Sequence, residues 1–302
     1  MINDAAMERR ATFYVLLAAL LWSTGGLGVK SVEMSPLALA GFRSLFAVPV
    51  LALAAALEAR RATDFRILAA LRRPLVWAAA VSYAVMVVSF VVAAKLTTAA
   101  NAILLQYSGP IYVALLSWPM LRERLRPIDV LATVGCALGM VLFFFDRVSS
   151  EGRIGDLVAI VSSWGFAGVP LLMRLEQSRH ARSSRWSGEA ASPMVAMILG
   201  NVIACVVCAP SMLRATSPGA GGWAVIVFLG AVQIGAAYWL YGAAVGRMPA
   251  LRSTLLATIE PVLNPLWVAL VRGEVPSKWA AVGGAIILAS VTAQGVVRAS
   301  RR

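Results

Sequence analysis

Apolar residues gather along the chain in runs of about 20, the length that an α-helix needs to cross the hydrocarbon core of a membrane. Short polar connections separate these runs, and only two of the connections are long enough to form sizeable loops. The pattern predicts an all-α integral membrane protein with ten transmembrane helices. The predicted spans are 11–30, 36–57, 74–94, 99–121, 128–145, 155–174, 193–213, 223–245, 250–271 and 279–297.

The second half of the sequence repeats features of the first. A shift of 151 residues aligns the fourth predicted span with the ninth and places Pro110 on Pro261. A shift of 142 residues aligns the first span with the sixth and places Trp22 on Trp164. Five spans per half is an odd number, so the halves would cross the membrane in opposite directions. We therefore predict two inverted-topology repeats of five helices each, with the bounds 1–146 and 147–302.

Composition and charge narrow the class further. The 302 residues are 60% hydrophobic and only 14% charged, and the net charge is +13. The Lys and Arg residues lie in short loops rather than on a basic patch with interleaved aromatic rings, so no nucleic acid partner is expected. Most of these loops lie on the same predicted side as both termini, and an excess of basic loops marks the cytoplasmic side. We expect a monomer in the inner (cytoplasmic) membrane, with both termini in the cytoplasm.

The segment "TIEPVLNPLW", 258–267, places polar groups in the middle of an apolar run. Glu260 and Asn264 fall on one face of the ninth predicted helix, and repeat symmetry matches this face to Gln106 on the fourth. An ionisable group inside a membrane span is costly, and it therefore indicates function. The prolines that the repeat aligns would bend both helices and expose backbone carbonyls. Interhelical hydrogen bonding, or an ion pair of Glu260 with Arg43 or Arg252, is the structural alternative.

Aromatic side chains form a second pattern inside the predicted spans. Tyr83 lies in the middle of the third span, and Tyr238 lies in the repeat-related eighth span. Trp22 and Trp164 occupy matching positions in the first and sixth spans. A buried Trp or Tyr needs a partner for its N–H or O–H group. These residues either pack against neighbouring glycines or line an aromatic cavity that suits an amphipathic solute.

Two longer stretches resemble a known family. "TTAANAILLQYSGPIYVALLSWPMLRERL" and "LRSTLLATIEPVLNPLWVALVRGEVPS" resemble the paired repeat of the EamA branch of the drug/metabolite transporter superfamily, and "LLWSTGGLGVKS" resembles its first span. Within that branch the aromatic-rich spans look most like the aromatic amino acid exporters of the YddG type. The resemblance implies transport by alternating access between two repeats. It leaves the substrate open, because the superfamily moves amino acids, sugars, nucleotide sugars and drugs.

Three function classes compete. A membrane enzyme would need a nucleophile with a base or a metal cluster, yet the single His lies in a predicted loop, so no enzyme activity, cofactor or metal is expected. A non-transporting scaffold would need larger loops or tails. The leading hypothesis is export of amino acids, with aromatic ones preferred, and the alternative is a broader metabolite or drug exporter. The expected substrate site comprises Trp22, Tyr83, Gln106, Trp164, Tyr238, Glu260 and Asn264, with Pro110 and Pro261 as helix-bending residues.

Overall fold

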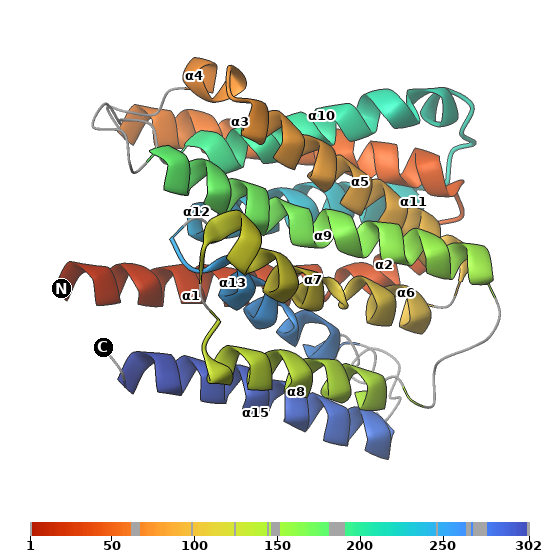
Figure 1. Cartoon of the computed structure of the whole chain (residues 1–302). Coiled ribbons are helices and arrows are strands. Elements are labelled where there is room, and N and C mark those ends of the chain that lie inside the picture. Colours follow the sequence, from red (N-terminus) through yellow and green to blue (C-terminus); the bar gives the residue numbers. More distant parts are fainter. Residues whose placement is uncertain are drawn as a thin grey trace.

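A computed structural model describes most of the chain as helix (Figure 1). Within the described residues there is no strand, which confirms the prediction of an all-α fold. The described residues are 2–61, 67–97, 99–123, 125–143, 145, 152–180, 191–245, 247–263, 267 and 277–300.

The helices of the first half begin with two segments of one broken span. These elements are α1 (Ile2–Trp22), α2 (Gly25–Ser31), α3 (Pro36–Arg61), α4 (Ile67–Leu71), α5 (Pro74–Leu96), α6 (Ala99–Gln106), α7 (Gly109–Leu116), the π-helical η1 (Ser117–Leu121) and α8 (Pro127–Phe143). The helices of the second half are α9 (Arg153–His180), α10 (Ala191–Leu213), α11 (Gly219–Phe228), the π-helical η2 (Leu229–Ala236), α12 (Ala237–Val245), α13 (Ala250–Ala257) and α15 (Lys278–Ser300). Residues 259–263 are also helical.

Six helical segments among the described residues are long and apolar enough to cross a membrane, so the chain is a multi-pass membrane protein. They coincide with the first, second, third, sixth, seventh and eighth predicted spans. The fifth and tenth predicted spans contain the shorter apolar helices Pro127–Phe143 and Ala281–Val297. The fourth span is divided into α6, α7 and η1, and the ninth contains α13 together with residues that lie outside the described part.

The helices pack in pairs that join the two halves of the sequence (Figure 1). The most extensive contacts are those of α5 with α9, α3 with α10 and α8 with α15, followed by α5 with α10, α3 with η2 and α1 with α12. The α6 and α7 segments lie on α9, while α13 lies on α1 and α7. The start of α1 and the end of α15 lie at the same end of the bundle. Every one of these contacts is between sequence-distant segments, so both halves of the chain contribute to one core.

The contact between α8 and α15 is particularly close. A Cβ atom added to Gly139 would lie only 2.8 Å from the carbonyl oxygen of Gly283, so small residues allow the two backbones to touch. The buried carboxylate of Asp129 accepts a hydrogen bond of 2.9 Å from Gln294 Nε2. Together these features hold one helix of each half against the other.

Three of the predicted spans are interrupted at a Ser or Thr residue. The chain leaves the helix at Ser23–Thr24, at Tyr107–Ser108 and at Thr258. At each break a Ser or Thr hydroxyl donates to a backbone carbonyl three residues earlier, as Ser108 Oγ does to Leu105 at 2.7 Å and Thr258 Oγ1 does to Leu255 at 2.6 Å. Such hydroxyls satisfy carbonyls that lose their helical partners inside a membrane. Irregular backbone at this depth is typical of segments that line a cavity.

The two aligned prolines lie just beyond two of these breaks. Pro110 is in the first turn of α7, and Pro261 lies in the helical segment that follows Thr258. A proline has no N–H group, so Pro110 leaves the Gln106 carbonyl without a helical donor and Pro261 does the same to Ala257. The two broken helices lie next to each other, because α7, which follows the first break, contacts α13, which precedes the second.

Candidate functional site

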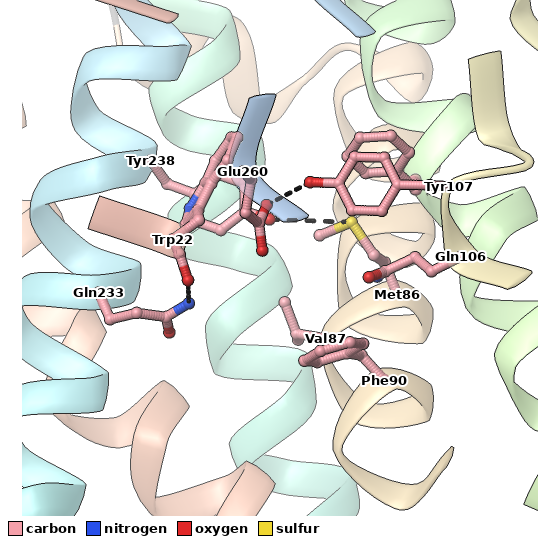
Figure 2. Close-up of a pocket in the computed structure, with 10 residues that line it drawn as sticks. Trp22, Met86, Val87, Phe90, Gln106, Tyr107, Gln233, Tyr238 and Glu260 are labelled. Carbon is pink, nitrogen blue, oxygen red and sulfur yellow. Dashed lines mark hydrogen bonds between the residues drawn. The ribbon is translucent and has the colours of Figure 1, made fainter. Parts of the chain in front are cut away.

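A small cavity lies in the middle of the bundle, where the broken helices meet (Figure 2). The space open to the centre of a water molecule is about 40 Å³. Gln106, Gln233 and Glu260 contribute polar side chains to its lining, and aromatic rings form much of the rest. The lining residues are Trp22, Met86, Val87, Phe90, Gln106, Tyr107, Phe166, Gln233, Tyr238 and Glu260.

Glu260 is the acidic group of this cavity. The Tyr107 hydroxyl lies within hydrogen-bond distance of two acceptors, the Glu260 carboxylate and the backbone carbonyl of Ala257, the latter at 3.1 Å. The Ala257 carbonyl is the one that Pro261 leaves without a helical donor. Tyr107 therefore joins the break between α6 and α7 to the break after α13, and it holds the carboxylate at the junction.

The predicted ion-pair partners of Glu260 make other contacts. Arg252 forms an ion pair with Glu8 on α1. Arg43 Nη2 donates a hydrogen bond of 2.8 Å to Gln233 Oε1. Arg43 is nevertheless near enough to Glu260 for the two charges to interact.

Gln233 connects Arg43 to the end of α1. Its Nε2 group donates to the Trp22 carbonyl at 3.3 Å, and Figure 2 shows this contact at the cavity wall. The Trp22 carbonyl is available because α1 ends there. Gln233 itself lies in the π-helical segment η2, and π-helical turns occur frequently at functional sites.

Aromatic rings pack around the polar groups. The ring centroids of Trp22 and Tyr238 are 4.7 Å apart, and Tyr241 packs against the same indole at 5.2 Å. Tyr83 lies behind Tyr238 in an edge-to-face contact at 4.6 Å. It is fully buried, and its hydroxyl accepts a hydrogen bond of 3.1 Å from Asn201. Tyr83 thus supports the cavity wall rather than lining it.

Gln106 lines the cavity from the last turn of α6. Its Nε2 group donates to Ser162 Oγ on α9 at 3.0 Å, and Ser162 donates in turn to the Met86 carbonyl on α5. The amide therefore joins three helices and also borders the cavity. Asn264, which shares its predicted face with Glu260, lies outside the described residues.

The structure does not bring Trp164 to the cavity. Its side chain is 53% exposed on the outer face of α9, where it stacks on Tyr112 with centroids 4.3 Å apart and planes 12° apart. Of the predicted site residues, the cavity brings together Trp22, Gln106, Tyr238 and Glu260, with Tyr83 directly behind them.

Sequence reasoning missed two polar residues of the site, Tyr107 and Gln233. Each carried a usable signal. Gln233 is an amide inside an apolar run, which is the criterion that selected Gln106. Tyr107 lies next to Gln106 and three residues before Pro110, where a helix break exposes carbonyls that need donors.

The broken helices and the central polar cavity define a class, that of multi-pass helical membrane proteins with an internal site between two halves of the chain. Comparison with known families specifies it further. The model of the EamA-like transporter family matches residues 9–145 and again residues 153–293. The chain belongs to the EamA-like transporter family, and the family's repeat occurs in it twice.

Individual relatives agree with this assignment. The chain is 29% identical over 276 residues to the uncharacterized transporter YwfM of Bacillus subtilis (strain 168), covering 89% of this chain and 88% of the relative. It is 27% identical over 214 residues to an uncharacterized transporter of Archaeoglobus fulgidus, covering 68% and 70% of the two chains. A crystal structure with 22% sequence identity superposes with a TM-score of 0.77 over 96% of this chain and 98% of the other, which shows the shared fold.

Proposed function

We propose that the protein exports amino acids, with aromatic ones preferred, by alternating access through the central cavity. The observation that carries this proposal is the combination of a carboxylate, Glu260, with an aromatic wall at the junction of broken helices. A carboxylate can replace the water that an ammonium group sheds on entering the membrane. Aromatic rings provide faces and edges against which another ring packs favourably.

The contact pattern supports movement of one half against the other. Exchanging each helix with its repeat partner converts the α1–α12 contact into the α5–α9 contact, and it converts α3–α10 and α8–α15 into themselves. This exchange symmetry favours two inverted five-helix repeats, 1–146 and 147–302, with ten spans in total. The position of the start of α1 and the end of α15 at one end of the bundle fits an even number of spans. On the distribution of Lys and Arg, we place that end in the cytoplasm and the protein in the inner membrane.

The cavity is too small for the proposed substrate, as expected of a conformation without bound substrate. About 40 Å³ accommodates about three or four water molecules, since one water needs about 10–15 Å³ on this measure. Pockets that hold a small ligand are about 300–1,000 Å³. Substrate entry therefore requires the helices around the cavity to separate. The breaks at Ser23–Thr24, before Pro110 and before Pro261 have fewer backbone hydrogen bonds to lose than a continuous helix.

The side chains that line or support the cavity then divide into groups for the ammonium group, the ring and the transport path. Glu260 binds the substrate ammonium group or gates the path. Trp22 and Tyr238, backed by Tyr83, contact the substrate ring. Gln106, together with Asn264 from the segment outside the described residues, contributes amide groups to the path.

Uptake into proteoliposomes tests the function. Purified protein should accumulate labelled phenylalanine, tyrosine or tryptophan faster than protein-free vesicles, and faster than it accumulates alanine. Equal uptake of unrelated metabolites or drugs would instead identify a broad-specificity exporter. Transport of none of these solutes would contradict the proposal.

The same vesicles separate two roles of Glu260. Glu260→Gln should weaken aromatic amino acid transport without changing its dependence on a pH gradient if the carboxylate holds the ammonium group. Loss of an existing gradient dependence would assign proton coupling to Glu260. Normal transport with a lowered unfolding temperature would show a purely structural residue.

A further inference from the structure

Arg43 is a buried cation whose described hydrogen-bond partner is uncharged, although the Glu260 carboxylate is near enough for the two charges to interact. The residue is only 4% exposed inside the membrane-spanning helix α3. Its Nη2 group donates to the neutral amide of Gln233, and its Nε group has no hydrogen-bond partner among the residues that the structure describes. An arginine inside a membrane span is expensive unless an anion or several acceptors compensate it. The described contacts leave part of this donor capacity unused.

Gln233 stands between Arg43 and the cavity. Its Oε1 atom accepts from Arg43 at 2.8 Å, and its Nε2 atom makes the longer contact of 3.3 Å with the Trp22 carbonyl. Gly25 provides the space for this amide, because a Cβ atom there would lie 2.6 Å from Nε2. The amide fits between α2 and α3 without a charged partner other than Arg43. A carboxylate entering the cavity could replace it, because a charged acceptor binds guanidinium more strongly than a neutral one.

A second buried donor without a partner among the described residues belongs to Trp22. Trp22 lines the cavity, and its buried indole Nε1 group has no acceptor within the described part of the chain. A buried donor without an acceptor destabilises the folded protein. An anion bound near Gln233 would supply an acceptor to the guanidinium.

We propose that the Gln233 side of the cavity is a carboxylate-binding subsite, in which the substrate carboxylate displaces the Gln233 amide from Arg43. The inference rests on the proposed function and specifies its substrate as a zwitterion. Glu260 receives the ammonium group and Arg43 the carboxylate, so one positive and one negative protein charge match one of each on the ligand. The aromatic rings of Trp22 and Tyr238 line the same cavity and pack against each other.

Three ligands that share one ring test the subsite. Phenylalanine has both charged groups, phenethylamine lacks the carboxylate, and 3-phenylpropionate lacks the ammonium group. Their affinities for the purified full-length protein can be measured from the ligand-dependent shift of its unfolding temperature in detergent. The wild-type protein should bind phenylalanine about tenfold more tightly than phenethylamine, which is the difference expected for one charge-assisted contact.

Two substitutions at Gln233 should act in opposite directions. Gln233→Glu gives Arg43 a permanent carboxylate, so the unliganded protein should unfold at a higher temperature and the preference for phenylalanine over phenethylamine should fall to about threefold or less. Gln233→Leu keeps a similar volume but removes the acceptor. The unliganded protein should then unfold at a lower temperature, and phenylalanine and 3-phenylpropionate should produce larger temperature shifts than in the wild type.

Glu260→Gln is the matched control. It should reduce the preference for phenylalanine over 3-phenylpropionate while leaving the ratio between phenylalanine and phenethylamine near its wild-type value. A structural arginine would give a different result, in which both Gln233 variants lower the unfolding temperature and the ligand ratios stay constant. That result would overturn the subsite.

The outcomes also separate the subsite from the transport function. Equal binding of phenylalanine and phenethylamine by the wild-type protein would overturn the carboxylate subsite and leave amino acid export standing. Binding and transport of none of the three ligands would overturn both. If Gln233→Glu fails to fold, the test still rests on the wild-type preference for phenylalanine over phenethylamine and on the temperature shifts of Gln233→Leu.

Discussion

Trp22 and Trp164 occupy matching positions in the two repeats but have opposite environments. Trp22 is 5% exposed and lines the central cavity, packed against Tyr238 and Tyr241. Trp164 is 53% exposed on the outside of α9 and stacks on Tyr112. The repeat thus duplicates the helices without duplicating the cavity wall. A site between two related halves can be asymmetric, and which copy contributes a side chain has to be determined from the packing.

Local backbone structure distinguishes the two positions. Helix α1 ends at Trp22, so the carbonyl of this residue is free to accept from Gln233. Helix α9 continues through Trp164 without interruption from Arg153 to His180. The broken copy is therefore the one that contributes backbone polar groups to the site.

Truncating the two tryptophans should give the largest contrast. Trp22→Ala removes a buried indole and should lower the free energy of unfolding by about 3–5 kcal/mol. Trp164→Ala loses mainly its stacking on Tyr112 and should cost about 0.5–1.5 kcal/mol. Denaturant unfolding in one detergent measures both. Equal losses would show that the outer tryptophan is also part of the folded core.

Removing the hydroxyl group should destabilise the protein more at Tyr107, beside the cavity, than at Tyr112, which stacks on Trp164. Tyr107→Phe deletes the donor to Glu260 and Ala257 and should cost about 1.5–3 kcal/mol, the range for hydrogen bonds to charged groups. Tyr112→Phe keeps the stacking on Trp164, and we expect a change below about 0.5 kcal/mol, as at surface sites. The unfolding measurement applies again. A larger effect at Tyr112 would reverse the assignment of inner and outer faces.

The matched prolines should also differ, by a smaller amount. Pro261→Ala restores an N–H group that can donate to the Ala257 carbonyl and displace the Tyr107 hydroxyl. We expect aromatic amino acid transport to fall about fivefold, which corresponds to roughly 1 kcal/mol. Pro110→Ala restores a donor to the Gln106 carbonyl and should have a weaker effect, because Tyr107 does not depend on that carbonyl. Equal rates for both variants would mean that the two breaks are functionally equivalent.

The smallest effect concerns exposure to lipid. In variants that retain a single tryptophan, brominated lipids should quench the fluorescence of Trp164 and leave that of Trp22 nearly unchanged, because only the former lies on the outer surface. Quenching of Trp22 to the same extent would place the cavity at the lipid boundary.

The sequence predicted the helical architecture and part of the site for clear physical reasons. Hydrocarbon excludes unpaired backbone groups, so long apolar runs become helices. The same cost makes Glu260 and Gln106 conspicuous, and both line the cavity. The orientation of Trp164 could not be predicted, because lipid and protein core are equally apolar and a helix in a membrane shows no solvent face. Tyr107 was missed since its role depends on the Ala257 carbonyl, 150 residues away.

The tight contact between Gly139 on α8 and Gly283 on α15 has a mechanical consequence. Two backbones in direct contact have no side chain between them to compress, and the Asp129–Gln294 hydrogen bond resists sliding. If one half of the molecule rocks against the other, we expect the axis of rotation to lie along this seam. Displacement then grows with distance from the axis, so α3 and α10, at the opposite edge of the bundle in Figure 1, travel farthest. The helices at the glycine contact would then move least, and the width of the bundle would set the largest displacement.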